Sequence, residues 1–138
     1  MSDVRAKGLE LFGEIMGEQR AAEMARGLES PGFGGAMAGL ATDFAFGSIW
    51  SREGLEREQR SLVTIGILIA QRQSAELKNH FRIALANGLT QQEIEEAVLQ
   101  SVPYVGFPAA TTASTAMVEV FRELGIGSAK TPEERGML

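Results

Sequence analysis

The segment from Glu76 to Arg82 contains the residues whose types and spacing best suit acid–base chemistry. His80 is the only histidine in the 138-residue chain, and Glu76 precedes it by four positions. Side chains four apart on a helix share a face, so the carboxylate can hold the imidazole in one tautomer and raise its pKa. The pair is therefore a candidate for proton transfer near neutral pH. The alternative is an ordinary exposed pair that contributes roughly a few tenths of a kcal/mol to the stability of the helix.

Two arginines and two aromatic residues could bind a substrate. An arginine at the edge of an apolar pocket can clamp a carboxylate, which suits Arg60 and Arg52; the alternative is a solvated charge at a helix end. Tyr104, the only tyrosine, lies in Pro103–Ala110, where two prolines and a glycine predict a sharp break between helices. Such a break can form a cavity wall, or simply a corner with a half-buried tyrosine. Trp50 could line a pocket or anchor the core.

Composition excludes several classes of function. The chain has no cysteine, which excludes thiol redox catalysis. With one histidine and no thiolate, a zinc site would have only carboxylates to complete it, and the acidic residues show no EF-hand-like spacing, so we predict no metal. The alternative is a hard-cation site built from Asp and Glu. The formal net charge of -5 argues against a nucleic-acid partner, because phosphate binding needs a basic surface.

The same composition indicates a protein that does not enter a membrane. A hydrophobic share of 44% and a charged share of 22% are typical of soluble globular proteins. The N-terminus lacks the apolar core of a signal peptide, and the longest apolar run, Leu62–Ala70, is too short to cross a bilayer. Together with the missing cysteines, these features predict a cytoplasmic location.

Helix-forming residues and turn signals predict an all-α fold: a compact bundle of about six helices in a single domain over residues 1–127, followed by a polar C-terminal tail over 128–138. Ala36–Ile49 is predicted to be one helix, and Ser74–Asn87 another that stops at Asn87-Gly88. Thr90 and Glu93 predict a capping box that opens the next helix. Pro103 is expected to end or kink it.

The apolar run Leu62–Ala70 is compatible with a buried strand or a buried helix, and its length with polar flanks favours the helix. A helix that is apolar all round must be buried on every side. In a small protein a subunit interface can achieve this, so we expect a homo-oligomer. The alternative is that this segment is the central helix of a monomeric bundle.

Five blocks in this order resemble the carboxymuconolactone decarboxylase family. The first looks like the family's aromatic-Gly-x-x-Trp-x-Arg-x-Gly-Leu loop, the second like its Arg-Ser helix opening, and the third like its Glu-Leu-x-x-His-x-Arg segment. The blocks are Phe46–Leu55, Arg60–Ile65, Glu76–Ala84, Glu93–Gln100 and Tyr104–Ala110.

The resemblance implies an alkyl hydroperoxidase D-like fold assembled as trimers or hexamers. It also implies cofactor-independent decarboxylation of 4-carboxymuconolactone in the β-ketoadipate pathway, with neither metal nor organic cofactor. The family's peroxidase branch uses a Cys-x-x-Cys pair before the histidine, which this chain lacks. Two alternatives remain open: a lyase or isomerase of the same fold acting on another small unsaturated acid or lactone, and a non-catalytic oligomeric binding protein.

Carried over to this chain, the resemblance assigns proton delivery to His80, held by Glu76. It assigns carboxylate binding to Arg60, with Arg52 or Arg82 as helpers. The remaining candidates would contact the lactone: Tyr104 and Gln100 as donors to its oxygen, and Trp50 and Phe46 as walls.

The chain also departs from the family pattern at four positions that we expect near the pocket. Phe44 stands where a polar or aromatic residue such as His or Tyr is common, and Val105 where cysteine is frequent. Thr111 and Ser114 replace the usual asparagine and aromatic residue after Pro-Ala-Ala. These departures bear on the substrate more than on the fold.

Overall fold

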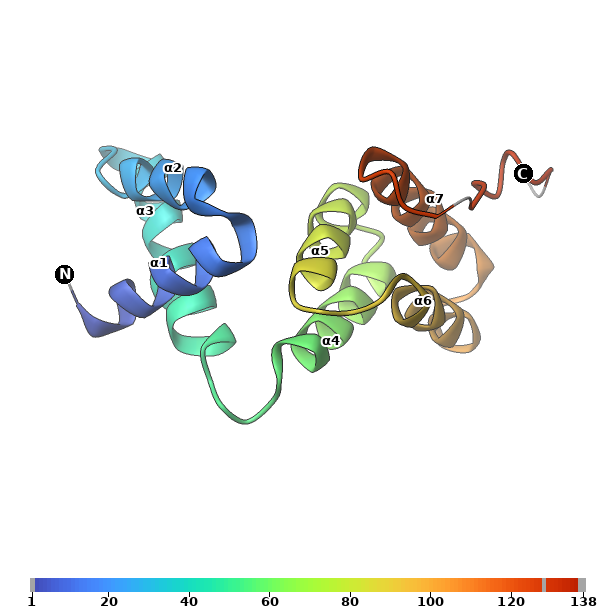
Figure 1. Cartoon of the computed structure of the whole chain (residues 1–138), viewed down its shortest axis with the longest axis horizontal. Helices are drawn as coiled ribbons and strands as arrows, with labels where there is room; N and C mark the ends of the chain where they lie inside the picture. The colour runs from blue at the N-terminus through green and yellow to red at the C-terminus, as the bar shows by residue number, and fades with distance from the viewer. Residues whose placement is uncertain (1, 128, 137–138) are drawn as a thin grey trace. The chain divides into compact units, whose positions relative to one another are not determined.

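The computed structural model describes residues 2–127 and 129–136, and all regular secondary structure in this part is helical (Figure 1). This confirms the all-α prediction, with seven α-helices and one π-helical segment where about six helices were expected. They are α1 (Asp3–Met16), α2 (Glu18–Leu28), α3 (Gly32–Leu40), η1 (Ala41–Trp50), α4 (Arg57–Ala70), α5 (Ser74–Ala86), α6 (Gln91–Val105) and α7 (Phe107–Glu123). Within the described ranges, no helix has the length and apolar character that crossing a membrane requires.

The helices gather into two compact units, one ending at Arg57 and the other beginning at Glu58. The N-terminal unit contains α1, α2, α3 and η1, and the C-terminal unit contains nearly all of α4 and the helices that follow it. The single domain over residues 1–127 stays a prediction.

The N-terminal unit is built on a close contact between α1 and η1. Leu11, Phe12 and Ile15 of α1 are buried, as expected of the apolar stripe of an amphipathic helix. The two backbones approach where α1 has Gly8 and η1 has Gly47. A Cβ atom at Gly8 would lie 2.0 Å from the backbone oxygen of Thr42, so only glycine fits there.

The predicted helix over Ala36–Ile49 changes its hydrogen-bonding pattern in the middle. The α-helix α3 ends at Leu40, and the chain continues without a break as the π-helical segment η1, which includes Phe46 and Trp50. π-Helical turns are rare and often occur at functional sites. Arg5 of α1 holds η1 from the side, because its Nε and Nη2 atoms donate to the Asp43 carboxylate at 2.9 and 2.7 Å.

The C-terminal unit encloses a continuous apolar core. Ile65 and Ile69 of α4 and Leu77 and Phe81 of α5 are fully buried, and α7 contributes a row of small and large apolar side chains that ends at Phe121. The alternation of alanines with larger residues on α7 lets its neighbours approach closely. This core fixes the faces of α5 and α6 that point outward.

Most helix ends follow the predicted signals. Thr90 Oγ1 accepts a hydrogen bond from the Glu93 amide at 3.1 Å, and the Glu93 carboxylate accepts one from the Thr90 amide at 2.9 Å, which confirms the capping box. Pro103 lies inside α6, which continues to Val105. The break between α6 and α7 comes at Gly106, whose φ of 85° favours glycine.

The helical prediction for Leu62–Ala70 is confirmed, but its burial on every side is not. Ile65 and Ile69 are fully buried, whereas Leu62, Val63 and Ile67 are 38%, 55% and 52% exposed. The reason is that the other helices of the C-terminal unit cover only one side of α4. The homo-oligomer expected from this helix stays a prediction.

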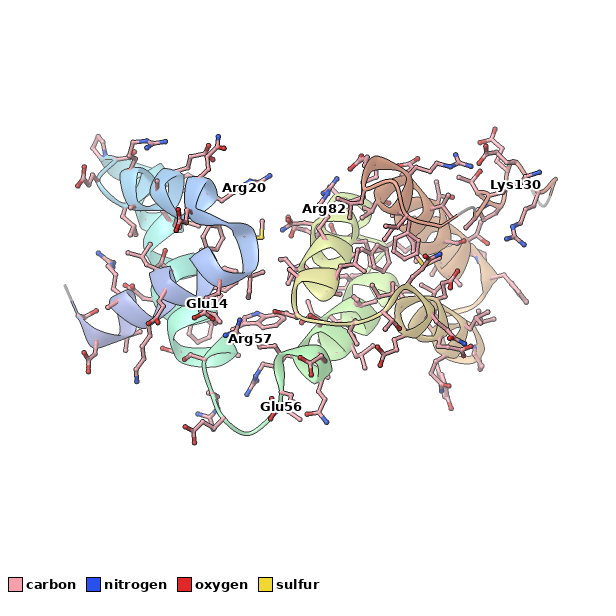
Figure 2. All side chains as sticks on the ribbon, viewed as in Figure 1. Glu14, Arg20, Glu56, Arg57, Arg82 and Lys130 are labelled. Atoms are coloured by element: carbon pink, nitrogen blue, oxygen red, sulfur yellow. The ribbon has the colours of Figure 1, made fainter. Side chains whose placement is uncertain are left out.

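The described part of the C-terminal segment, residues 129–136, forms a capped turn. The Glu134 carboxylate accepts hydrogen bonds from the Thr131 amide at 2.9 Å and from Arg122 of α7 at 2.5 Å. Thr131 is buried, while most other described side chains here, Lys130 among them, are exposed (Figure 2). Ser128 and residues 137–138 of the predicted polar tail lie outside the described residues.

Candidate functional site

Helix α5 presents Glu76 and His80 one turn apart, as their spacing predicts. Glu76 is exposed and His80 is half-buried. Burial lowers the pKa of His80 below its ordinary value, and the negative charge of Glu76 raises it only in part. The carboxylate therefore acts in the predicted direction, but the net shift of the pKa is downward. At neutral pH the free protein holds His80 mainly as the neutral imidazole.

Arg60 lies in the first turn of α4 and is half-buried. Its backbone oxygen accepts a hydrogen bond from Thr64 Oγ1 at 2.8 Å. The next residue, Ser61, is fully buried and accepts a hydrogen bond from Asn87 Nδ2 at 2.9 Å, at the C-terminal end of α5. The helix that carries Arg60 is thus fastened to the helix that carries His80.

Tyr104 and Gln100 line one groove of about 710 Å³ between α4 and α6. Leu62 and Gly66 form its α4 side, and Tyr104 is 80% exposed. A phenol and a carboxamide here can donate hydrogen bonds to a ligand that lies on apolar surface. The roles predicted for Tyr104 and Gln100, as donors to a ligand oxygen, stay predictions.

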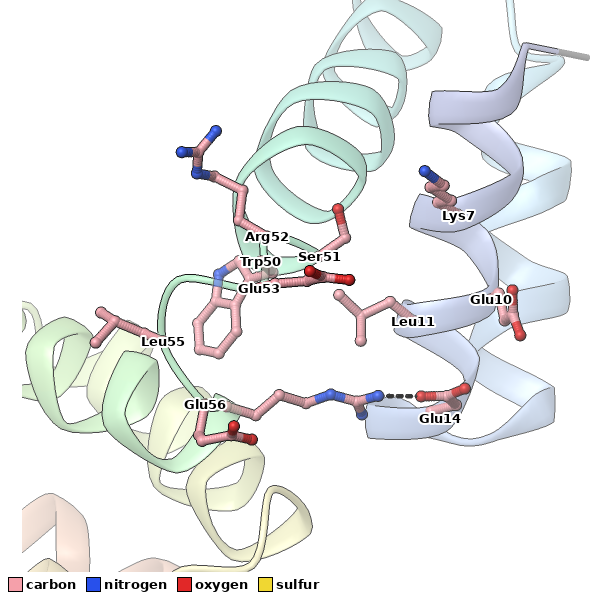
Figure 3. Close-up of a pocket in the computed structure, with 11 residues that line it drawn as sticks. Lys7, Glu10, Leu11, Glu14, Trp50, Ser51, Arg52, Glu53, Leu55 and Glu56 are labelled. Carbon is pink, nitrogen blue, oxygen red and sulfur yellow. Dashed lines mark hydrogen bonds and ion pairs between the residues drawn. The ribbon is translucent and has the colours of Figure 1, made fainter.

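Trp50 and Arg52 line a pocket of about 450 Å³ in the N-terminal unit (Figure 3). Arg57 and Glu14 form an ion pair on one side of this pocket, and Arg52 points away from that pair (Figure 3). Phe46 stands behind Trp50 rather than in the pocket wall. Its ring stacks on the indole at a centroid distance of 6.5 Å.

The predicted site residues therefore fall into three groups. Glu76 and His80 share a face of α5, Gln100 and Tyr104 share a groove, and Trp50 and Arg52 share a pocket. The first two groups and Arg60 belong to the C-terminal unit, and Phe46, Trp50 and Arg52 belong to the N-terminal unit. The catalytic and binding roles of all these residues stay predictions.

Arg82, considered as a helper in carboxylate binding, has another partner. Its Nη2 atom lies 2.5 Å from the Glu123 carboxylate of α7, at the surface (Figure 2). This ion pair ties α5 to α7 and lowers the pKa of Glu123. The role of Arg82 as a helper in carboxylate binding stays a prediction.

The four departures from the family pattern lie in different places. Val105 lines the same groove as Tyr104. Thr111 and Ser114 line a separate hollow of about 300 Å³ with Phe107 of α7 and residues of α6. Phe44 is 63% exposed on η1.

The sequence reasoning missed the roles of Ser61 and Asn87. Ser61 belongs to the Arg-Ser block that opens α4, and Asn87 to the Asn-Gly pair predicted to end α5, but the sequence showed each only as a local signal. Two short polar residues that are 26 positions apart carry no sign in sequence of a mutual hydrogen bond. The sequence did contain one hint: Ser61 is a polar residue on the otherwise apolar, buried side of α4, and a buried hydroxyl group needs a hydrogen-bond partner.

Comparisons with known proteins agree with the all-helical fold and with the five sequence blocks that resemble the family. The family model described as "Carboxymuconolactone decarboxylase family" matches residues 35–119. A 4-carboxymuconolactone decarboxylase of Acinetobacter baylyi is 37% identical over 128 residues, which cover 93% of this chain and 94% of that protein. The nitrosuccinic acid decarboxylase npaB of Metarhizium robertsii is 41% identical over 95 residues, which cover 68% of this chain and 66% of that protein. The chain therefore belongs to the carboxymuconolactone decarboxylase family.

Proposed function

We propose that this protein is a cofactor-independent decarboxylase of 4-carboxymuconolactone and that His80 delivers the proton. The observation that carries the proposal is the 37% identity to a 4-carboxymuconolactone decarboxylase over almost the whole of both chains. The half-buried His80, one turn after Glu76, supplies a group that can carry the proton.

The substrate itself can supply the electron sink. 4-Carboxymuconolactone has a carboxylate and an acetate arm on the same ring carbon of an unsaturated lactone. When the bond from that carbon to the carboxylate breaks, its electron pair passes into the lactone, carbon dioxide leaves and a dienolate forms. A proton transferred to carbon completes the reaction. The protein must bind the remaining carboxylate, stabilise the dienolate oxygen and deliver the proton.

We assign the proton to the imidazolium form of His80. The lowered pKa of the free protein favours the neutral imidazole, which would be a poor donor. A substrate with two carboxylates changes this balance, because nearby negative charge favours the protonated form of histidine. Binding of the dianion would thus raise the pKa of His80 and favour the protonated imidazolium form, which can donate the proton. Glu76 contributes in the same direction.

Arg60 is the proposed clamp for the acetate carboxylate, because a guanidinium can bind a carboxylate through two parallel hydrogen bonds. Gln100 and Tyr104 are the proposed donors to the lactone oxygen. Both side chains line one groove with Leu62 and Gly66 of α4, and a phenol and a carboxamide can donate hydrogen bonds to a developing oxyanion there.

A second candidate substrate follows from the other relative. Nitrosuccinic acid also has an acetate arm next to a carboxylate, with a nitro group as the acceptor. Loss of the carboxylate next to the nitro group would leave a nitronate, which needs the same clamp and the same proton. We therefore propose a shared substrate class: succinates with an electron-withdrawing group on the carbon that loses carbon dioxide.

The test is carbon dioxide release by the metal-stripped protein from 4-carboxymuconolactone and from nitrosuccinate, side by side. His80→Ala and His80→Gln should lose at least ~100-fold in kcat, in line with the loss of a general acid. Asn79→Gln, one position away on α5, is the matched control and should keep wild-type turnover. Full activity of His80→Ala would contradict the role of His80. No turnover of either compound by the wild type would favour another acid, or the binding-protein alternative.

We also propose that the protein is a homo-oligomer. Apolar side chains four, three and four positions apart form an exposed stripe along α3 and η1, and part of α4 is exposed as well. Exposed apolar patches of this kind mark interaction surfaces. The stripe consists of Phe33, Met37, Leu40 and Phe44.

A further inference from the structure

The hydrogen bond between Ser61 and Asn87 closes the open end of a helical hairpin. Helices α4 and α5 follow one another with a connection of three residues, so they form an antiparallel pair joined at one end. At the other end, Asn87 Nδ2 donates to Ser61 Oγ at 2.9 Å. Ser61 is fully buried and Asn87 is 7% exposed, so water does not compete for this bond.

A second contact shows that the two helix ends meet. Gly88 follows Asn87 with a φ of 102°, and a Cβ atom there would lie 3.6 Å from the carboxylate of Glu58. Glu58 belongs to the first turn of α4, two residues before Arg60. The end of α5 therefore lies directly against the turn that carries the proposed carboxylate clamp.

We propose that Ser61 and Asn87 are positioning residues that hold Arg60 in register with the helix that carries His80. The inference rests on the proposed function, in which Arg60 and His80 act on one substrate. Ile65 and Ile69 of α4 and Phe81 of α5 belong to one buried apolar cluster. Apolar contacts have no preferred direction, so they tolerate small shifts along the helix axes. A buried hydrogen bond is directional and fixes one register.

A positioning role of Ser61 and Asn87 can be distinguished from a role in stability alone. Loss of one partner leaves the other buried without its hydrogen bond, which destabilises the protein whatever its function. Replacement of both partners by apolar groups of similar size removes that penalty but also removes the directional bond. The double variant Ser61→Ala/Asn87→Leu therefore tests the positioning role without the loss of stability that an unsatisfied buried group would cause.

The experiment compares wild type with this double variant and with Thr64→Val as the matched control. Thr64→Val also removes a hydroxyl hydrogen bond near Arg60, but that bond lies within α4 and does not reach α5. The melting temperature, kcat and KM for 4-carboxymuconolactone, and amide hydrogen exchange over residues 61–64 are measured for each protein. Ser61→Cys, which keeps the approximate size of the side chain but weakens the hydrogen bond, is the second test variant if the double variant does not fold.

We expect the double variant to melt close to the wild type, with KM raised about 10-fold, kcat lowered less than KM is raised, and exchange over residues 61–64 at least 10-fold faster. Thr64→Val should keep the wild-type KM. A KM within twofold of wild type, with unchanged exchange, would overturn the proposal. If wild type does not turn over the lactone, the proposed function fails, and the exchange comparison still decides whether the pair fixes the first turn of α4.

Discussion

His80 lies one helical turn after Glu76, yet burial lowers the pKa of its imidazole more than the carboxylate raises it. In the proposed function, the pair is a proton carrier that the lowered pKa leaves mostly as the neutral imidazole in the free protein. Binding of a dianionic substrate would then favour the imidazolium form, and proton delivery would depend on the presence of substrate. A solvent-exposed pair would be partly protonated at all times near neutral pH.

The titration of His80 can be followed directly, because it is the only histidine in the sequence. NMR of the single histidine should give a pKa below the ordinary value of 6.5, and Glu76→Gln should lower it further because a favourable charge is lost. Excess succinate, an unreactive dicarboxylate, should raise it. Lys78→Gln on the same helix is a control for the removal of a charge of opposite sign, and it should not lower the pKa. An unshifted pKa in all of these samples would show that His80 is simply exposed.

The same shift predicts how stability depends on pH. The pKa of His80 is lower in the folded than in the unfolded state, so the unfolded state binds the proton first. This contribution to stability is complete above pH ~6.5 and is lost as the pH falls through the folded-state pKa. Denaturant titrations of wild type and His80→Gln between pH 8 and pH 5 should therefore diverge, with the wild type losing more stability. Parallel curves would contradict this linkage.

The contacts of the Glu134 carboxylate stabilise the C-terminal turn and are also sensitive to acid. Hydrogen bonds from the Thr131 amide and from Arg122 lower the pKa of Glu134 to about 2. The folded-state pKa is lowered, so the stabilisation is complete above the ordinary glutamate value of 4.5 and is lost as the pH falls towards 2. Limited proteolysis of the segment should accelerate over that window. Glu134→Gln should make cleavage fast already at pH 6, whereas Glu133→Gln, its exposed neighbour, should leave the profile unchanged.

The contact between α1 and η1 predicts the effect of an added methyl group. A Cβ atom would lie 2.0 Å from the Thr42 backbone oxygen at Gly8, and 2.4 Å from the Val4 oxygen at Gly47. Either Gly8→Ala or Gly47→Ala should destabilise the protein by about 1–3 kcal/mol or more, because backbone atoms must move apart. Gly34→Ala meets nothing within 4 Å in α3 and should stabilise it by up to ~1 kcal/mol. Equal unfolding free energies for the three variants would contradict the close approach.

The exposed stripe on α3 and η1 predicts the behaviour of the protein in solution. Light scattering coupled to size exclusion should give a mass above that of one chain, and Leu40→Glu should shift it towards the monomer. Gln19→Glu adds the same charge at an exposed position of α2 and should leave the mass unchanged. A monomeric wild type, or a Leu40→Glu protein that assembles normally, would contradict the proposed assembly.

Features decided by neighbouring residues were predictable from the sequence. The capping box of Thr90 and Glu93 and the Asn87-Gly88 stop depend on side chains within a turn of the backbone groups they satisfy. The spacing of Glu76 and His80 places them on one face of any helix that contains them. The all-α class and the family blocks follow from such local patterns, repeated along the chain.

Features that depend on distant residues were decided only by the tertiary structure. The direction of the His80 pKa shift depends on how deeply α5 is buried, and sequence spacing showed only the opposing effect of Glu76. The bond between Ser61 and Asn87 joins residues 26 positions apart, and the exposed side of α4 depends on which helices pack against it. Burial and long-range hydrogen bonds are properties of the packed core, whereas helix caps and faces are properties of the local chain.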